Sequence, residues 1–323
     1  MARENTWKNS IVSAWGETVS HWGWSTVSDQ ATSLDKTEAT THPEKSGDWI
    51  AQEFFHWLLQ TKSSERTVCA EASEWRTVER LDQWINSSSS QDRLMPYSAS
   101  VVPKLLARLR QDGHSSTELA QQVQHDMALA TDVMRMANSV YYRRSSQVLT
   151  LNSAILMIGD DGLRSVIARA MIKPIFTASG NGLVTRSAQR LWGHVENKAQ
   201  RCAVMAKGEG LDPFMAYLAG LVHDAAWVAT FRGLDKIHDD GAPWCFDSAL
   251  IDALLQRRDR LFGLLAVRWQ LEADLIEAAN EVSKRGLRNA QLPLARILCS
   301  ADEMSSRLAL SLFGKNVNPI KAN

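Results

Sequence analysis

Long apolar runs are missing from this sequence of 323 residues: none reaches the roughly 18 residues that a membrane-spanning helix needs. No transmembrane helix is therefore expected. The first ten residues carry charges with no apolar segment behind them, which is not the pattern of a secretory signal. Together these absences predict a protein of the cytoplasm.

An excess of charge of one sign is also missing, because 36 basic residues face 36 acidic ones. A balanced chain is not expected to have the coating of nucleic acid or of anionic membranes as its main task. The four cysteines form no CxxC pair and no zinc-finger spacing, so we expect reduced thiols and no disulfide framework.

Strand signals are absent as well, since no segment alternates convincingly and no hairpin dipeptide separates β-branched runs. What is present is helical spacing of apolar residues. It is clearest in two segments, 98–110 and 116–138. Glycines punctuate the pattern like helix C-caps, at Gly113, Gly159, Gly210, Gly233 and Gly286. The sequence predicts an all-α fold without internal repeats.

Tryptophan is concentrated before residue 90, and its spacing predicts an amphipathic arm within residues 1–47. Trp7, Trp15 and Trp22 recur with apolar residues between them at the period of one helical face. The arm could dock on its own protein, contact a partner or lie on a membrane, although the basic face of a membrane-surface helix is missing. Residues 25–47 are polar and predict a linker.

Three further regions follow the arm. Residues 48–91 predict a helical accessory region of two helices, about 48–59 and 70–85, the first capped by Asp48. Residues 92–312 predict a multi-helix bundle, and residues 313–323 a tail.

Several motifs in the bundle region share their order and spacing with one family. They are "RLMPYSASVVPKLLARL" at 93–109, "QHDMALATDVMRMANSVYY" at 124–142, "TLNSAILMIGDDGLRSVI" at 150–167, "LWGHVENKA" at 191–199 and "LAGLVHDAAW" at 218–227. The chain resembles the HDOD domains of bacterial signalling proteins over residues 93–312. The resemblance implies an HD-like helical bundle that acts as a regulatory or interaction module.

The third motif also has a reading that needs no family. Thr150 can cap a short helix that Gly159 ends with a left-handed turn, after which Asp160 can cap a second helix. This is a helix-turn-helix outline, which DNA-binding proteins use but which many all-α cores share. We favour simple helix packing.

The resemblance also singles out candidate metal ligands. HDOD domains are similar to the HD metal-dependent phosphohydrolases, which hold a divalent metal with a histidine, a His-Asp pair and a later aspartate. His194, the pair His223–Asp224 and Asp302 match these positions in order. Two imidazoles and two carboxylates suit Mn²⁺, Mg²⁺ or Fe²⁺, and such a metal would activate water and polarise a phosphoryl oxygen.

Departures from the hydrolase pattern favour a structural remnant. Ala226 and Trp227 stand where those enzymes have a glycine and a phosphate-binding lysine, and no histidine occurs at 277–282, where a second metal pair would fall. The alternative is that His223 and Asp224 hydrogen-bond to each other and to His194 inside the bundle. We therefore expect no required cofactor, with a divalent metal as the alternative.

A basic segment offers a candidate binding surface. Between residues 135 and 210, eleven basic residues face four acidic ones, which leaves a charge of about +7. The candidates for anion or partner binding are Arg143, Arg144, Arg164 and Arg169. A solvated face is the alternative, and the aromatic residues of a single-strand channel are lacking.

Three functions remain open from the sequence. The resemblance implies a non-catalytic regulator that contacts signalling proteins in two-component, chemotaxis or cyclic-dinucleotide circuits. The alternatives are a metal-dependent phosphohydrolase that uses His194, His223, Asp224 and Asp302, and a nucleic-acid-binding regulator that uses the basic segment.

Overall fold

The structure is a computed structural model that describes residues 47–61, 71–87, 116–139, 142, 147–177, 182–237 and 246–316. The predicted arm before Gly47, the opening motif at 93–109 and the last seven residues lie outside the described residues. So do Arg143 and Arg144.

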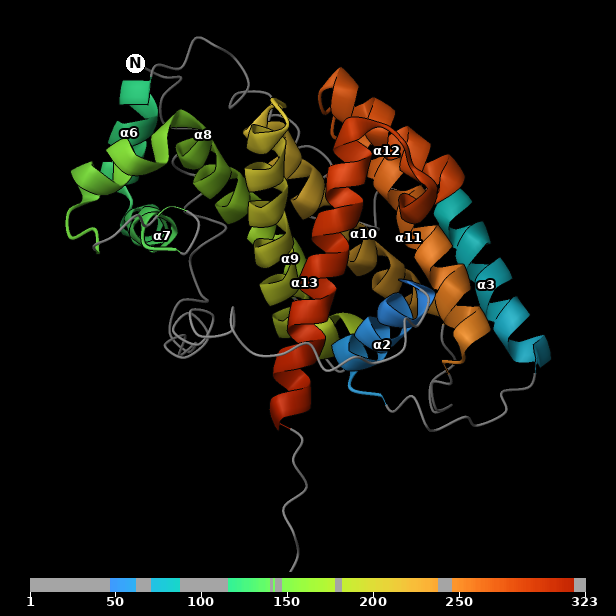
Figure 1. Ribbon diagram of the computed structural model, residues 1–323. Coiled ribbons are helices and arrows are strands. Elements are labelled where there is room, and N and C mark those ends of the chain that lie inside the picture. The colour runs from blue at the N-terminus through green and yellow to red at the C-terminus, as the bar shows by residue number, and fades with distance from the viewer. Residues whose placement is uncertain are drawn as a thin grey trace, which may run out of the picture. The chain divides into compact units, whose positions relative to one another are not determined.

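Within the described ranges the regular structure is entirely helical, which confirms the predicted all-α class. The helices are α2 (Gly47–Leu59), α3 (Glu71–Asn86), α6 (Ser116–His125), α7 (Met127–Ala137), α8 (Leu151–Ile172), α9 (Leu183–Gly208), α10 (Pro213–Ile237), α11 (Ser248–Arg268), α12 (Ala273–Arg285) and α13 (Pro293–Asn316), with short 3-10 turns at Lys173–Phe176 and Leu287–Asn289. Figure 1 shows α13 running beside α9, with α11 and α12 packed together.

Helix α10 forms the core. Almost every residue from Phe214 to Leu234 is buried, because α8, α9, α11, α13 and α3 all pack against it. Among the described helices it is also the one long and apolar enough to cross a membrane, but 94% of its most apolar window is buried inside the protein. A helix that is apolar on all sides is what the centre of a helical bundle requires.

The segment 116–138 forms two helices where its apolar spacing predicts one. Asp126 adopts an extended backbone between α6 and α7, and its carboxylate accepts hydrogen bonds from the N–H groups of Ala128 and Leu129. The aspartate thus acts as an N-cap that starts a new helix. His125, at the end of α6, is exposed.

Asn138 closes α7 and ties it to the start of α8. Its side-chain amide donates to the carbonyls of Met134 and Val148 and accepts from the N–H of Val148. Thr150 then caps α8 as predicted, by accepting from the N–H of Ser153, and Gly159 kinks α8 at a φ of 65°. The helix, glycine turn and helix outline is therefore present, and it packs against α7 and α10.

Helices α2 and α3, which precede the family-like region, belong to the same packed core. Phe54, Phe55, Leu58 and Leu59 of α2 are buried, and Arg190 and Arg186 of α9 donate to the last carbonyls of that helix. These donors satisfy backbone groups that every helix end leaves open. The accessory region is thus joined to the bundle by apolar and polar contacts.

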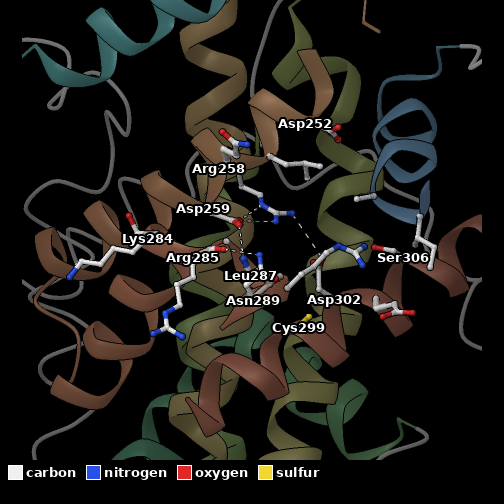
Figure 2. Close-up of a pocket in the computed structure, with 18 residues that line it drawn as sticks. Asp252, Arg258, Asp259, Lys284, Arg285, Leu287, Asn289, Cys299, Asp302 and Ser306 are labelled. Carbon is white, nitrogen blue, oxygen red and sulfur yellow. Dashed lines mark hydrogen bonds and ion pairs between the residues drawn. The ribbon is translucent and has the colours of Figure 1, made fainter. Parts of the chain in front are cut away.

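Two of the glycines predicted as C-caps behave differently. Gly286 ends α12 with a φ of 79°, as predicted, and the next N–H, of Leu287, donates to Asp259 of α11 at 2.8 Å (Figure 2). Gly233 lies inside α10, so its predicted role is wrong. A Cβ there would come within 2.5 to 2.9 Å of Leu81 and Trp84, because α3 crosses α10 at this point.

Candidate functional site

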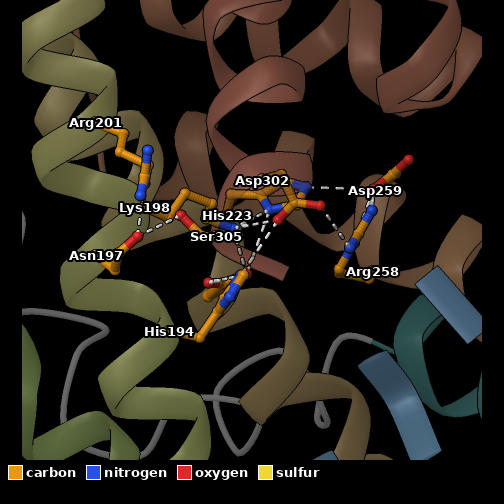
Figure 3. A network of polar contacts seen from close by, with 10 residues as sticks. His194, Asn197, Lys198, Arg201, His223, Arg258, Asp259, Asp302 and Ser305 are labelled. Carbon is orange, nitrogen blue, oxygen red and sulfur yellow. Dashed lines mark hydrogen bonds and ion pairs between the residues drawn. The ribbon is translucent and has the colours of Figure 1, made fainter. Parts of the chain in front are cut away.

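The four residues predicted as metal ligands meet in the interior of the bundle. His194 comes from α9, the His223–Asp224 pair from α10 and Asp302 from α13 (Figure 3). The Nε2 atom of His194 lies 3.5 Å from Oδ2 of Asp224 and 3.4 Å from Oδ1 of Asp302. Folding therefore brings three separate helices together at one polar cluster.

A lysine that the motif comparison passes over occupies the centre of this cluster. Lys198 lies one helical turn after His194 on α9 and is completely buried. Its ammonium donates to Asp224 at 2.5 Å and to Asp302 at 2.9 Å, and it lies 2.9 Å from Nδ1 of His223 (Figure 3). One cation thus contacts three of the four predicted ligands.

The ammonium explains how two carboxylates can be ionised in this buried place. Burial alone would raise the pKa of Asp224, but Lys198 and the neighbouring imidazoles outweigh burial and hold that pKa at about 2. The same opposition holds the pKa of Asp302 well below its usual range, with Arg258 as a further positive charge. Both acids are therefore anions at neutral pH, and Lys198 is their main counter-ion.

A second ion pair flanks the cluster on α11. Asp259 accepts from Nε and Nη2 of Arg258 at 2.9 and 2.7 Å, and one of its oxygens lies 3.4 Å from Nε2 of His223. The guanidinium also lies over the ring of Trp227 at 5.3 Å. Trp227 therefore supports an arginine from α11, at the place in the motif where a hydrolase would have its lysine.

Helix α2 closes the cluster from another side. The ring of Phe54 lies 4.3 Å from the imidazole of His194, measured between centroids, and Phe55 packs against Trp227 and Phe231. The side chains of His194, Lys198 and the His223–Asp224 pair are fully buried as a result.

The arrangement was tested against a divalent metal. One ligand atom each from His194, Asp224 and Asp302 can be chosen so that all lie within 4.8 Å of one another, which is close enough to share an ion. However, the ammonium of Lys198 already takes the oxygens Oδ1 of Asp224 and Oδ1 of Asp302. A metal here would meet a buried positive charge at hydrogen-bond distance of its own ligands, so the residues as arranged do not fit a divalent ion.

The described residues of the candidate basic surface do not form a common exposed face. Arg169 is buried and forms ion pairs with Asp132 and Glu196. Arg164 is half-buried, and its Nε makes no hydrogen bond to another described residue. Lys198 lies in the central cluster.

Comparisons with known proteins define the class. The HDOD domain model matches residues 95–284, so the chain belongs to the HDOD family. The match includes His194 and the His223–Asp224 pair but ends before Asp302. No curated protein matches.

Solved structures agree on the fold. A protein from Shewanella amazonensis, provisionally named a metal-dependent phosphohydrolase, aligns with a TM-score of 0.52 and 16% identity over 75% of this chain and 92% of its own. An HDOD domain protein of unknown function from Geobacter sulfurreducens aligns with a TM-score of 0.48 and 20% identity over 71% of this chain and 77% of its own.

Sequence reasoning missed Lys198, Arg258 and Asp259. A signal for Lys198 was available, because residues four apart share a helix face and Lys198 follows His194 by four. Counting it among surface charges concealed this. No comparable signal exists for Arg258 and Asp259, since only packing of α11 against α10 brings them to the cluster.

Proposed function

We propose that this protein is a non-catalytic regulator of bacterial signalling, in which the HDOD domain acts as a binding module for other signalling proteins in the cytoplasm. The observation that carries the proposal is the ammonium of Lys198 between Asp224, Asp302 and His223. An internal cation that is part of the fold replaces one that would have to be bound.

The chemistry of a hydrolase requires features that this cluster does not offer. A catalytic metal keeps an open coordination position for water or substrate. Here the ammonium uses the ligand oxygens, Phe54 covers His194 and the side chain of Asp224 is fully buried. Of the four predicted ligands only Asp302 has an appreciably exposed side chain, at 19%. The cluster is better suited to holding three helices together than to turning over a phosphate ester.

The nature of the partner follows from the family and not from a surface. HDOD membership favours protein partners from a signalling circuit, including circuits that use cyclic dinucleotides. Nucleic acid is less favoured, because Arg169 and Lys198 of the basic segment are buried in ion pairs.

A metal and activity measurement on the full chain tests the non-catalytic half of the proposal. We expect protein purified without chelator to hold no stoichiometric Mn, Mg or Fe, and added metal not to raise its melting temperature. Phosphodiesterase and phosphomonoesterase activities should stay at background. About one metal per chain, lost together with hydrolysis in His223→Ala, would establish the phosphohydrolase instead.

The regulatory half is tested in the source bacterium. The variant His194→Gln removes a required ligand of any HD-type metal but little else, because neither ring nitrogen of His194 makes a hydrogen bond to a described residue. A folded His194→Gln protein should restore the phenotype of a gene deletion as well as wild type does. Failure of this variant to restore the phenotype, with a normal melting curve, would contradict the proposal.

A further inference from the structure

A cavity of about 510 Å³ lies beside the central cluster, on the face of Asp302 that is open to solvent (Figure 2). Helices α2, α11, α12 and α13 and the turn after Gly286 form its walls. Its volume falls within the range of roughly 300 to 1,000 Å³ that is usual for small-molecule sites. Neither the family assignment nor the proposed function gives this cavity a role.

The acidic side chains that line the cavity are already partnered. Asp259 accepts from Arg258 and from the N–H of Leu287. Asp302 accepts from Lys198. The remaining two acids also have donors: Asp252 accepts from Gln52 at 3.0 Å, and Glu303 accepts from Arg307 at 2.8 Å. The negative charge of the lining is therefore largely neutralised.

One buried cation of the lining keeps a donor in reserve. Arg258 is only 5% exposed, and Nε and Nη2 are the atoms with which it binds Asp259. Its Nη1 donates no hydrogen bond to a described residue, and the nearest acid, Oδ2 of Asp302, is 4.0 Å away. A rigid guanidinium with a free N–H edge on a cavity is well suited to contacting an anion.

Two more cations line the same cavity at the end of α12. Among the described residues Lys284 has no ion-pair partner, and Arg285 has only Glu281 at 3.8 Å, with 59% of the arginine side chain exposed. Such an exposed pair is weak. A helix C-terminus favours cations in any case, so the position of these two residues is ordinary. Their value is that they add positive charge to a cavity with a free guanidinium edge.

We propose that this cavity binds a small phosphate-bearing molecule, with the phosphate contacting Nη1 of Arg258 and attracted by Lys284 and Arg285. A phosphate monoester carries a charge of about −1.5 to −2 at neutral pH, which matches the two unneutralised cations at the edge. Ile50 and Leu255 supply an apolar wall for the rest of the molecule. This inference goes beyond the proposed function, because binding here requires neither a protein partner nor the absence of metal.

Calorimetric titration of the full chain with pyrophosphate and with inorganic phosphate, at constant ionic strength, tests the site. The double variant Lys284→Glu/Arg285→Glu changes only exposed residues and should keep the fold. We expect it to weaken pyrophosphate binding on the order of tenfold or more. The matched control Lys207→Glu/Lys236→Glu makes the same change of charge at exposed residues that do not line the cavity, and it should change affinity less than about twofold.

A third variant and a second ligand sharpen the test. Arg258→Lys keeps the charge but removes the guanidinium edge, and it should weaken binding without changing the rim. Citrate should bind more weakly than pyrophosphate. Absence of pyrophosphate binding by the wild type, equal losses in both double variants, or equal binding of citrate would each overturn the proposal.

Discussion

Two buried charge clusters in this protein differ in how completely their polar atoms are satisfied. In the first, Arg169 of α8 binds Asp132 and Glu196, and none of these three side chains has a buried atom without a hydrogen-bond partner. In the second, around Lys198, both ring nitrogens of His194, Nε2 of His223 and Oδ2 of Asp224 lack such a partner among the described residues. Buried polar groups are rarely left in this state.

The clusters also differ in which force controls their acids. Burial raises the pKa of Glu196 even though Arg169 lowers it, whereas Lys198 and the imidazoles overcome burial at Asp224. The first cluster is an ordinary ion-pair network that joins helices. The second has more donors and acceptors than one ammonium can use, which is what a ligand set retains when its central ion is replaced by a side chain.

Removal of the central cation should have the largest effect. Lys198→Met leaves Asp224 and Asp302 without their counter-ion, and breaking a buried pair in this way costs about 3–5 kcal/mol. Arg169→Met is the matched comparison and should cost less, because the side chains of Asp132 and Glu196 are 21% and 14% exposed and Arg135 remains beside both. Urea unfolding of both variants measures the difference.

Metal rescue sharpens this comparison further. With the ammonium gone, Mn²⁺ should raise the melting temperature of Lys198→Met and leave wild type and Arg169→Met unchanged. Equal losses of stability in the two variants, without rescue of either, would show that the two clusters are the same kind of structure.

Acid should narrow the gap between wild type and Lys198→Met. The pKa of Asp224 is held at about 2 in the folded wild type, so the stability it contributes is complete above its unfolded pKa of about 3.9 and is lost as the pH falls towards 2. In the variant burial raises that pKa, so protonation relieves a buried charge and favours the fold. The free energies of unfolding at pH 7 and pH 3.5 measure this, and a constant gap would refute it.

Loss of one imidazole should have a moderate effect. His223→Ala leaves Lys198 and Asp259 each with one contact fewer, and an unsatisfied buried group costs on the order of 1–3 kcal/mol. Chemical denaturation measures the change. His125→Ala, at an exposed site on α6, is the control and should be close to neutral.

The smallest effect is expected at the edge of the first cluster. Arg135 contacts Glu196 at 3.1 Å and Asp132 at 3.4 Å, but 46% of its side chain is exposed. Arg135→Ala should therefore cost less than about 1 kcal/mol. A loss as large as that of Arg169→Met, measured by the same denaturation, would mean that the network depends on its exposed member.

Much of the architecture could be predicted from local patterns. The helical class, the cap at Thr150, the kink at Gly159 and the end of α12 at Gly286 follow from properties of a few neighbouring residues. The break at Asp126 was missed because apolar spacing continues across it, while the capping carboxylate ends one helix and starts the next. Gly233 was misread because its reason is the approach of α3, which lies far away in the chain.

The sequence by itself determined which groups would be available at the site, since His194, the His223–Asp224 pair and Asp302 occupy the positions that their motif requires. Only the tertiary structure decided what lies between them. Lys198 is one of 36 basic residues until α9, α10 and α13 pack together and bury it. A buried ammonium must then find carboxylates, and buried carboxylates must find a cation. Within the bundle each was the nearest partner for the other.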